Sequence, residues 1–425
     1  MQSKELIQAI KSGQMSKLFS DIYGEGKHQE YQVKRYTDAV ERFVGFYGDG
    51  EISIFSAPGR TEIGGNHTDH QHGEVLAASI NLDAIAIVKK TVDSVVRVRS
   101  DEYPEVAISL DNLSACADEK GTTLSLIKGV LAGFTENDLK IGGFHAYITS
   151  DVLIGSGLSS SAAFEVLIGT ILSGLYNDIN VSPVLIARIG QYAENIYFGK
   201  PCGLMDQMAC SVGGLVHIDF AVPKEPLVEK VNFSLEEYGY SMCITDTKGS
   251  HADLTHEYAA VPGEMKAVAG FFGKEVLRDV PAEDILANIG TIRENAGDRA
   301  VLRALHFVNE NKRVGKEVAA LQADNMVGFL KAVKESGDSS YKYLQNVYSN
   351  SDVEHQNVSL ALALSEMFLG EDGVCRVHGG GFAGTIQAFV KSNMVDGYCR
   401  CMDEVFGEGA CTAMQIRKYG GIKVV

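Results

Sequence analysis

The chain has 425 residues, of which 45% are hydrophobic, so it is long enough for two or three domains with substantial cores. Its formal net charge is −17 and its lysines and arginines form no long runs, which argues against nucleic acids and anionic membranes as partners. The N-terminus lacks the apolar segment of a secretory signal, and no stretch reaches the ~18 apolar residues of a membrane span. We therefore expect a cytoplasmic, globular protein.

The eight cysteines are scattered without the spacing of a disulfide framework. In a chain of this length, such a distribution is typical of reduced thiols in a cytosolic protein. Cys399 and Cys401 are close in sequence but isolated from other ligands, so we expect no zinc site there.

The first part of the chain alternates between helical and strand patterns. Residues 1 to about 48 have the apolar spacing of helices, and residues 52–57 are typical of a strand that ends in a turn at 58–60. An irregular segment with two glycines, Gly64 and Gly65, follows. Further strands are predicted at 75–80, 84–88, 95–98 and 143–149.

Residues 66–72 place three histidines and an aspartate within seven positions. A metal site is a weak interpretation, because the spacing matches no helical histidine pair. Sugars require dense, alternating hydrogen-bond donors and acceptors, which the amide, carboxylate and imidazoles of this loop supply. A solvated turn remains the simpler alternative.

Residues 155–163 read G-S-G-L-S-S-S-A-A and precede an apolar periodic run at 164–176. This pattern predicts a loop that opens onto a helix N-terminus, where backbone N–H groups and the positive end of the dipole favour phosphate. An ordinary serine-capped helix is the alternative. No lysine follows the glycines, so this is not a Walker P-loop, and phosphate charge must be neutralised from elsewhere.

Asp206 lies among apolar residues in the segment C-G-L-M-D-Q, which covers 202–207 and follows a predicted amphipathic helix at 184–197 that carries Glu194. A partly buried carboxylate needs a partner, and a cation such as Arg60 would keep it ionised. An aspartate that caps the next helix is an equally good interpretation at this stage.

The second half of the chain is predicted to be mostly helical. Two prolines and several charges at 221–232 mark the best domain boundary. Helices are expected near 262–272, 282–290, 297–310, 312–322, 325–335 and 355–369. The segment V-H-G-G-G-F-A-G at 377–384 precedes a strand at 385–390, and its glycines permit either a close backbone approach or a plain tight turn.

Four segments together resemble the GHMP small-molecule kinases, and within them the galactokinases. They are G-R-T-E-I-G-G-N-H-T-D-H at 59–70, the loop at 155–163, C-G-L-M-D-Q at 202–207 and G-G-G-F-A-G at 379–384. The resemblance runs from about residue 35 to the C-terminus. It implies an α+β, two-lobed fold with the active site in the cleft between an N-terminal domain (35–225) and a C-terminal domain (226–425), preceded by a helical extension (1–34).

The resemblance implies an ATP-dependent phosphorylation of the anomeric hydroxyl of galactose, which gives galactose 1-phosphate and ADP with Mg²⁺ as cofactor. Asp206 matches the catalytic carboxylate, and Arg60 matches the arginine that stabilises the transition state and keeps that carboxylate ionised. Ser161 and Glu194 match the metal ligands. The positions implied to bind ATP are Ser100, Gly155, Ser156, Gly157, Leu158, Ser159, Ser160 and Ser161, and those implied to bind the sugar are Asn66, His67, Thr68, Asp69, Gly203 and Tyr258.

The sequence departs from the galactokinase pattern at a few positions. Asn66 replaces the glutamate that reads the C6 hydroxyl, so the resemblance also admits a C6-variant sugar such as galacturonate, because an amide does not repel a carboxylate. Glu62 replaces an asparagine, His70 a tyrosine and Leu153 a proline.

Two other functions remain open at this stage. One is a non-catalytic sugar sensor, and the other is a kinase for another metabolite such as mevalonate or homoserine. The intact phosphate loop, Arg60 and Asp206 favour an enzyme over a sensor, and the H-T-D and C-G-L-M-D-Q segments favour a sugar. We expect a monomer or a weak homo-oligomer.

Overall fold

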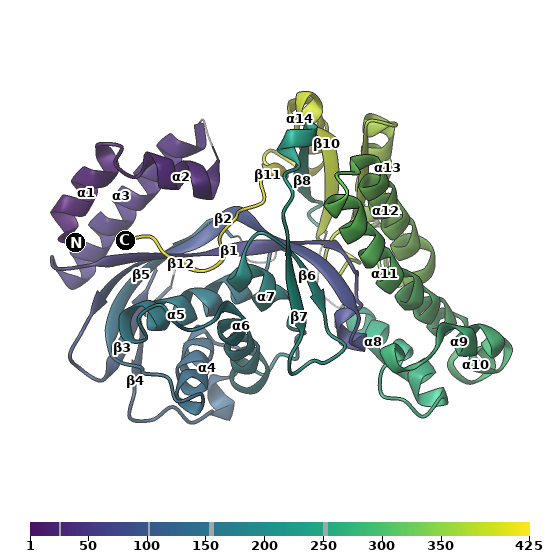
Figure 1. Cartoon of the computed structure of the whole chain (residues 1–425), viewed down its shortest axis with the longest axis horizontal. Coiled ribbons are helices and arrows are strands. Elements are labelled where there is room, and N and C mark those ends of the chain that lie inside the picture. Colours follow the sequence, from purple (N-terminus) through teal and green to yellow (C-terminus); the bar gives the residue numbers. More distant parts are fainter. Residues whose placement is uncertain (25–26, 101–102, 153–156, 250–253) are drawn as a thin grey trace.

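The computed structural model describes residues 1–24, 27–100, 103–152, 157–249 and 254–425 (Figure 1). Helices surround an eight-stranded sheet and a four-stranded sheet. This mixture confirms the predicted α+β class. Among the described helices, none is both long and apolar enough to cross a membrane.

The larger sheet is organised around its two longest strands. β1 (Ser53–Gly64) pairs with β2 (Glu74–Lys90) in antiparallel fashion over nearly its whole length. The two halves of β2 have different second neighbours, β6 (Leu215–Asp219) at its start and β5 (Phe144–Ser150) at its end. The remaining strands are β3 (Val95–Arg99), β4 (Val106–Ser109), β7 (Leu227–Val231) and β12 (Ile422–Lys423).

The turn predicted at residues 58–60 is wrong, because β1 continues through it. The pairing with β2 shifts register between Pro58 and Arg60, which bends the strand without ending it. A Cβ at Gly59 would lie 2.8 Å from the carbonyl oxygen of Leu158, so the bend brings β1 against the predicted phosphate loop. The strands predicted at 75–80 and 84–88 are likewise one strand, β2.

Each face of the larger sheet is covered by its own helices (Figure 1). On β2, Ile85 and Ile87 pack in the cluster of the N-terminal helices, whereas Ala84 and Ala86 pack in the cluster of α5, as the period of two in a strand requires. The N-terminal helices are α1 (Ser3–Lys11), α2 (Ser16–Tyr23) and α3 (Lys27–Tyr47), and those on the other face are α4 (Thr123–Glu136), α5 (Ser160–Tyr176), α6 (Pro183–Tyr192) and α7 (Met205–Val212).

The smaller sheet has the order β11–β8–β10–β9. Its strands are β8 (Tyr240–Asp246), β9 (Gly373–Val377), β10 (Thr385–Lys391) and β11 (Cys411–Met414), and only β10 was predicted. The helices of this half are α8 (Thr255–Phe271), α9 (Ala282–Ala287), α10 (Ile289–Ala296), α11 (Asp298–Gln322), α12 (Met326–Ser339), α13 (Asn357–Leu369) and α14 (Val395–Phe406).

Several predicted helices have different bounds in the structure. The helices predicted at 297–310 and 312–322 form a single helix, α11. The helix predicted at 184–197 ends at Tyr192, and a wider π-helical turn (Ala193–Phe198) carries Glu194. The domain division at residue 225 stays a prediction, and two strands from beyond it, β7 and β12, belong to the larger sheet.

A buried polar cluster fixes the N-terminal helices to the larger sheet. Asp83 on β2 is fully buried and accepts hydrogen bonds from Arg35 (2.7 Å), Tyr23 (2.7 Å), Arg417 (2.8 Å) and the Ser56 hydroxyl. Burial alone would raise the pKa of the Asp83 carboxyl. The two guanidinium charges and these hydrogen bonds lower it by a larger amount, so the net pKa lies below the usual value. The carboxylate therefore ties together four separate segments of the chain.

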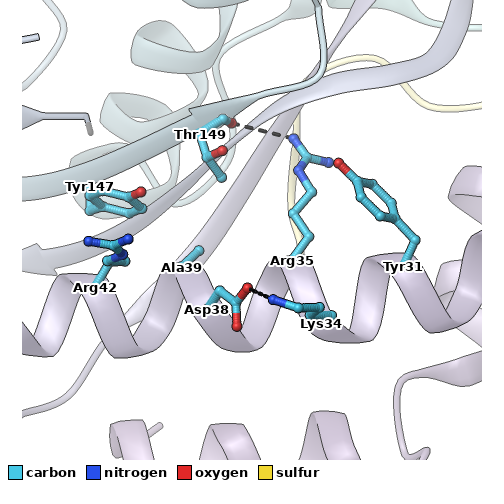
Figure 2. A pocket seen from close by; sticks show the side chains of 8 residues that line it. All are labelled: Tyr31, Lys34, Arg35, Asp38, Ala39, Arg42, Tyr147 and Thr149. Atoms are coloured by element: carbon cyan, nitrogen blue, oxygen red, sulfur yellow. Dashed lines mark hydrogen bonds and ion pairs between the residues drawn. The ribbon is translucent and has the colours of Figure 1, made fainter. Parts of the chain in front are cut away.

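A pocket lies between α3 and β5 (Figure 2). Arg35 points from α3 toward the sheet and donates to the carbonyl oxygen of Thr149 at 3.4 Å, whereas Lys34 and Asp38 form an ion pair on the exposed side of the helix. The lining residues are Tyr31, Lys34, Arg35, Asp38, Ala39, Arg42, Tyr147 and Thr149. None of them is a predicted site residue, so this pocket belongs to the contact between the extension and the sheet.

Candidate active site

Arg60 and Asp206 form a bidentate ion pair. Arg60 Nε donates to Asp206 Oδ1 at 2.7 Å, and Nη2 donates to Oδ2 at 2.9 Å. Arg60 lies in the bent part of β1, and Asp206 lies in the first turn of α7, so the pair joins the sheet to a helix N-terminus. The guanidinium side chain is 8% exposed, whereas the carboxylate is 34% exposed and can be reached by a ligand.

The surroundings keep Asp206 ionised. Burial alone would raise the pKa of its carboxyl. The charge of Arg60 and the hydrogen bonds from Arg60 and the Ser159 hydroxyl lower it by a larger amount, so the net pKa lies below the usual value. An accessible, ionised carboxylate of this kind can accept a proton from a bound hydroxyl group. The structure thus confirms the partner that the sequence predicted for this aspartate.

The phosphate loop contacts this pair directly. Arg60 Nη1 donates to the carbonyl oxygen of Gly157 at 2.6 Å, and the Arg60 backbone N–H donates to that of Leu158 at 3.1 Å. Ser159 takes a left-handed conformation (φ 60°, ψ 59°) immediately before α5, from which its hydroxyl reaches Asp206. Gly155 and Ser156 lie outside the described residues. The described part of the loop therefore places the N-terminus of α5 next to the ionised carboxylate.

The predicted metal ligands lie side by side. Ser161 Oγ donates to Glu194 Oε1 at 3.3 Å, and Glu194 is only 3% exposed. Gln207 Nε2 donates to the other carboxylate oxygen at 2.9 Å and so fixes the orientation of Glu194. Lys200 also contacts Oε1 at 3.3 Å, and its side chain is largely exposed. Two oxygen ligands and a nearby cation thus face the end of the phosphate loop.

Three residues of this group were not predicted from the sequence: Gln207, Lys200 and Glu165. Gln207 Nε2 also donates to Glu165 Oε2 at 3.0 Å, so one amide connects two buried carboxylates. Burial and the neighbouring charge of Glu194 raise the pKa of Glu165 well above its usual value, which favours the neutral acid. The position of Gln207 beside Asp206 in the C-G-L-M-D-Q segment is the signal that could have identified it.

The loop at 66–72 meets the glycine-rich loop at 379–381 through backbone carbonyls. His67 Nε2 is 3.0 Å from the carbonyl oxygen of Gly380, and the Tyr258 hydroxyl donates to that of Gly381 at 2.9 Å. A carbonyl only accepts, so Nε2 carries the proton and Nδ1 is left as an acceptor. Burial and the neighbouring His70 lower the pKa of His67 to about 4, which keeps its ring neutral.

Asp69 and Gly203 approach each other closely. A Cβ at Gly203 would lie 2.0 Å from Asp69 Oδ2, so any larger residue there would displace the Asp69 carboxylate. The other carboxylate oxygen of Asp69 accepts the backbone N–H of His70 at 2.9 Å. Gly203 lies three residues before Asp206, which brings the 66–72 loop next to the Arg60–Asp206 pair.

We expect Gly203→Ala to lower kcat/KM for the sugar about 10- to 100-fold, because Asp69 must move to make room for the new methyl group. Steady-state kinetics at saturating ATP measures this change. Gly263→Ala is the matched control, since a Cβ at that helical position meets nothing within 4 Å. Equal kinetics for the two variants would contradict the role of this contact.

Two predicted sugar-binding residues have their side chains engaged within the protein. Asn66 is fully buried: its Nδ2 donates to Glu62 (3.0 Å) and to the carbonyl oxygen of Gly379 (2.7 Å), and its Oδ1 accepts from Asn346 (2.8 Å). Thr68 Oγ1 is also buried and bonds two carbonyl oxygens of its own loop. This placement does not match the direct sugar contact predicted for Asn66 and Thr68, because neither side chain is accessible.

The third glycine-rich segment is held against β1 by His378. Its Nε2 is 3.0 Å from Thr61 Oγ1, and its Nδ1 is 2.9 Å from Thr385 Oγ1. A Cβ at Gly157 would lie 2.8 Å from that same Thr385 oxygen, so the phosphate loop also touches this segment. The segments at 155–163, 202–207 and 379–384 thus converge on β1, which itself carries part of the segment at 59–70.

Ser100 follows β3, and within the described residues no hydrogen bond links it to the site.

Comparisons with known proteins agree with this geometry. Residues 41–90 match the model described as the galactokinase galactose-binding signature, and residues 125–214 match that of the GHMP kinases N terminal domain. A galactokinase of Actinobacillus pleuropneumoniae serotype 3 (strain JL03) is 33% identical over 364 residues, which are 84% of this chain and 90% of the relative. A galactokinase of Streptomyces coelicolor is 30% identical and covers 88% of this chain and 94% of its own length.

The chain belongs to the galactokinase family. Among solved structures, Lactococcus lactis galactokinase complexed with galactose matches with a TM-score of 0.77 at 24% identity, covering 90% of this chain and 98% of that chain. A mevalonate kinase matches with a TM-score of 0.59 at 16% identity. These two structures confirm the predicted GHMP kinase fold.

The structure explains two departures from the galactokinase pattern together. The family has an amide where this chain has Glu62 and a carboxylate where it has Asn66, so the two groups have exchanged positions. The exchanged side chains touch, and Arg376 binds the relocated carboxylate at 2.8 Å. Burial raises the pKa of Glu62, although Arg376 opposes this shift. This chain therefore has one buried carboxylate–amide pair at the two exchanged positions.

We expect Asn66→Glu alone to lower the free energy of unfolding by about 1–3 kcal/mol, because it buries a second carboxyl beside Glu62 and removes the donor to Gly379. Combining it with Glu62→Asn recreates the family arrangement and should recover part of the loss, with a coupling of about 0.5–3 kcal/mol. Urea denaturation of the four proteins in this cycle measures both quantities. Strictly additive effects would show that the two positions do not compensate.

Proposed function

We propose that this chain is an ATP-dependent galactokinase that phosphorylates the anomeric hydroxyl of galactose and releases galactose 1-phosphate and ADP. The observation that carries the proposal is the Arg60–Asp206 pair, with its accessible carboxylate next to the N-terminus of α5. Phosphoryl transfer needs an oriented nucleophile and neutralised phosphate charge, and this arrangement supplies both.

Asp206 acts in this proposal as the acceptor of the sugar hydroxyl proton. Arg60 orients the carboxylate through two hydrogen bonds and stabilises negative charge as it develops on the phosphoryl group. The Ser159 hydroxyl donates a hydrogen bond to Asp206 Oδ2, so the substrate cannot approach all sides of the carboxylate equally. Residues 155–161 bind the ATP phosphates at the N-terminus of α5.

Mg²⁺ fits the oxygen donors at Ser161 and Glu194. Both offer hard oxygen atoms, and the hydrogen bond from Gln207 leaves Glu194 Oε1 directed toward Ser161. When bound there, Mg²⁺ would neutralise charge on the ATP phosphates. Lys200, which contacts the same carboxylate, adds the positive charge that the loop itself lacks.

We expect Gln207→Ala to raise the Mg²⁺ concentration needed for half-maximal activity about 10- to 100-fold, since Gln207 orients a metal ligand without itself providing one. Activity measured against free Mg²⁺ at fixed ATP tests this. A variant with an unchanged Mg²⁺ dependence would contradict the assignment of Glu194 as a ligand.

The sugar is bound in this proposal by His67, Asp69 and Tyr258 around the backbone of Gly203 and the glycine-rich loop. The neutral ring of His67 offers its Nδ1 as an acceptor, and Asp69 offers a carboxylate oxygen. Since Asn66 is buried and hydrogen-bonded within the protein, no observation favours a C6 carboxylate on the substrate. Galactose is therefore the preferred substrate over galacturonate.

Turnover of a sugar panel with ATP and Mg²⁺ tests the function. We expect preference for galactose over galacturonate, N-acetylgalactosamine, 2-deoxygalactose, glucose and arabinose. Preference for galacturonate would assign a different sugar to the same chemistry. Sugar binding without turnover of any of them would identify a sensor and reject the proposed enzyme.

A further inference from the structure

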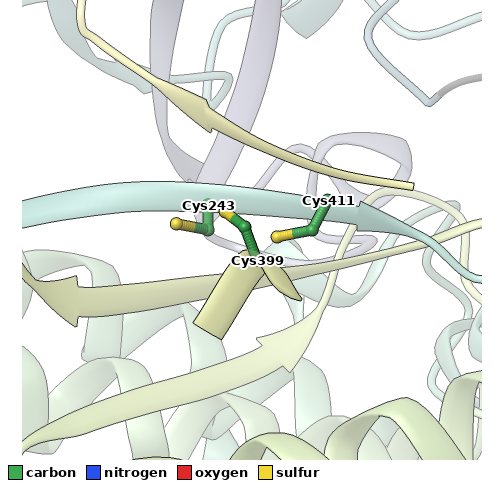
Figure 3. Close-up of side chains that lie close together, drawn as sticks. All are labelled: Cys243, Cys399 and Cys411. Carbon is green, nitrogen blue, oxygen red and sulfur yellow. The ribbon is translucent and has the colours of Figure 1, made fainter. Parts of the chain in front are cut away.

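Three cysteines that are distant in sequence converge beneath the smaller sheet (Figure 3). Cys243 lies on β8, Cys411 on β11 and Cys399 on α14, and their sulfur atoms all lie within 4.8 Å of one another. The expectation that Cys399 is isolated from other ligands is therefore wrong. Sequence spacing could not reveal the cluster, because its members are brought together only by strand pairing and helix packing.

The sheet register fixes two of the three thiols. Cys411 pairs with Thr245 and Ala413 pairs with Cys243, so the two cysteines are diagonal neighbours on adjacent strands and share one face. Cys243 and Cys411 are buried, and α14 packs over this face and directs Cys399 between them. The cluster is thus a preformed arrangement of sulfur atoms in a rigid setting.

We propose that Cys243, Cys399 and Cys411 form a binding site for one thiophilic metal ion, Zn²⁺ or Cu⁺. Thiolate ligands select these ions over Mg²⁺, which prefers oxygen. Sulfur atoms bound to one zinc ion at about 2.3 Å are within roughly 4 Å of each other, so the observed spacing requires little movement. Cys399 is the least buried of the three, and its side provides access for the ion and for a solvent ligand.

The site is structural and independent of phosphoryl transfer. The ion would join α14 to β8 and β11 through three metal–sulfur bonds. Cysteine binds metal as the thiolate, so binding of the ion releases the protons that it displaces from the thiols. Affinity should consequently rise with pH.

Metal titration of the reduced, metal-free full-length chain tests the proposal. Zn²⁺ binding is measured by competition with a chromophoric chelator, Cu⁺ binding by anaerobic competition with a Cu⁺-specific chelator, and Cd²⁺ by its ultraviolet sulfur-to-metal charge-transfer absorption. We expect one ion per chain, release of protons on binding and a higher midpoint of thermal unfolding. The ion that competes at the lower free concentration is the assigned ligand.

The variant Cys399→Ser should bind at least tenfold more weakly, whereas Cys375→Ser, a buried cysteine of the same core cluster outside the sulfur group, should bind as the parent does. A stoichiometry near zero for both ions, or equal binding by Cys399→Ser and the parent, would overturn the proposal. Should Cys399→Ser fail to fold, protection of the three thiols from alkylation by added metal in the parent gives the same decision.

Discussion

Asp206→Asn should lower kcat about 10²- to 10⁴-fold while galactose binding is retained, because the amide keeps the shape of the side chain but cannot accept the hydroxyl proton. Turnover is measured by a coupled ADP assay. The chain contains no tryptophan, so binding is better followed by calorimetry than by intrinsic fluorescence. Substantial turnover by this variant would reject Asp206 as the base.

The matched control is Asp219→Asn, which removes a carboxylate that pairs with Arg278 at 2.9 Å on β6. We expect its turnover to stay within about twofold of the parent.

The pH profile gives a further check. The pKa of Asp206 lies below the usual aspartate value of about 3.9, so the ionised form persists above that pH and is lost only as the pH falls through the lower value. Asp206 should therefore introduce no acid limb in kcat/KM between pH 5 and 8.

Asp83→Ala should lower the free energy of unfolding by about 3–5 kcal/mol, because it leaves the buried guanidinium groups of Arg35 and Arg417 without their shared carboxylate. Urea denaturation followed by far-ultraviolet circular dichroism measures the loss. Asp38→Ala is the control, since its ion pair with Lys34, on the same helix as Arg35, is exposed and should contribute about 0.5 kcal/mol or less. Similar losses in both variants would mean that the Asp83 cluster is not a main determinant of stability.

The same residue sets a pH dependence of stability. The pKa of Asp83 is lower in the folded chain than the unfolded value of about 3.9, so its contribution is complete above that pH and disappears as the pH falls through the folded value. The parent should lose stability on acidification below about pH 4, and Asp83→Ala should lose less over the same interval.

The sequence predicted those parts of the site that depend on local patterns. The strand at 143–149, the loop before α5 and the partner of Asp206 follow from hydrophobic period, glycine placement and the cost of a buried charge. The bend of β1 could not be predicted in this way. Pro58 and Gly59 indicate a turn locally, but pairing with β2 on one side and the phosphate loop on the other keeps the strand continuous.

Other features required the tertiary fold. Glu62 and Asn66 are four residues apart on an irregular path, so nothing in the sequence shows that they touch or that Arg376, from β9, binds Glu62. The sequence alone indicates no role for Gln207 in the C-G-L-M-D-Q segment, because only the structure shows that its amide lies between two carboxylates. The strands β8, β9 and β11 were missed since each is only a short run of four to seven residues.

The Asp83 cluster also places a constraint on how the chain is made. Arg417 is 334 residues further along the chain than the carboxylate it binds. At a synthesis rate of about 5–20 residues per second, Asp83 and Arg35 wait roughly 17–67 s before Arg417 has been added. During that interval the Asp83 carboxylate in the nascent larger sheet has only one of its two guanidinium counterions, that of Arg35. Chaperones that bind nascent chains therefore meet a larger sheet whose buried carboxylate is not yet fully paired.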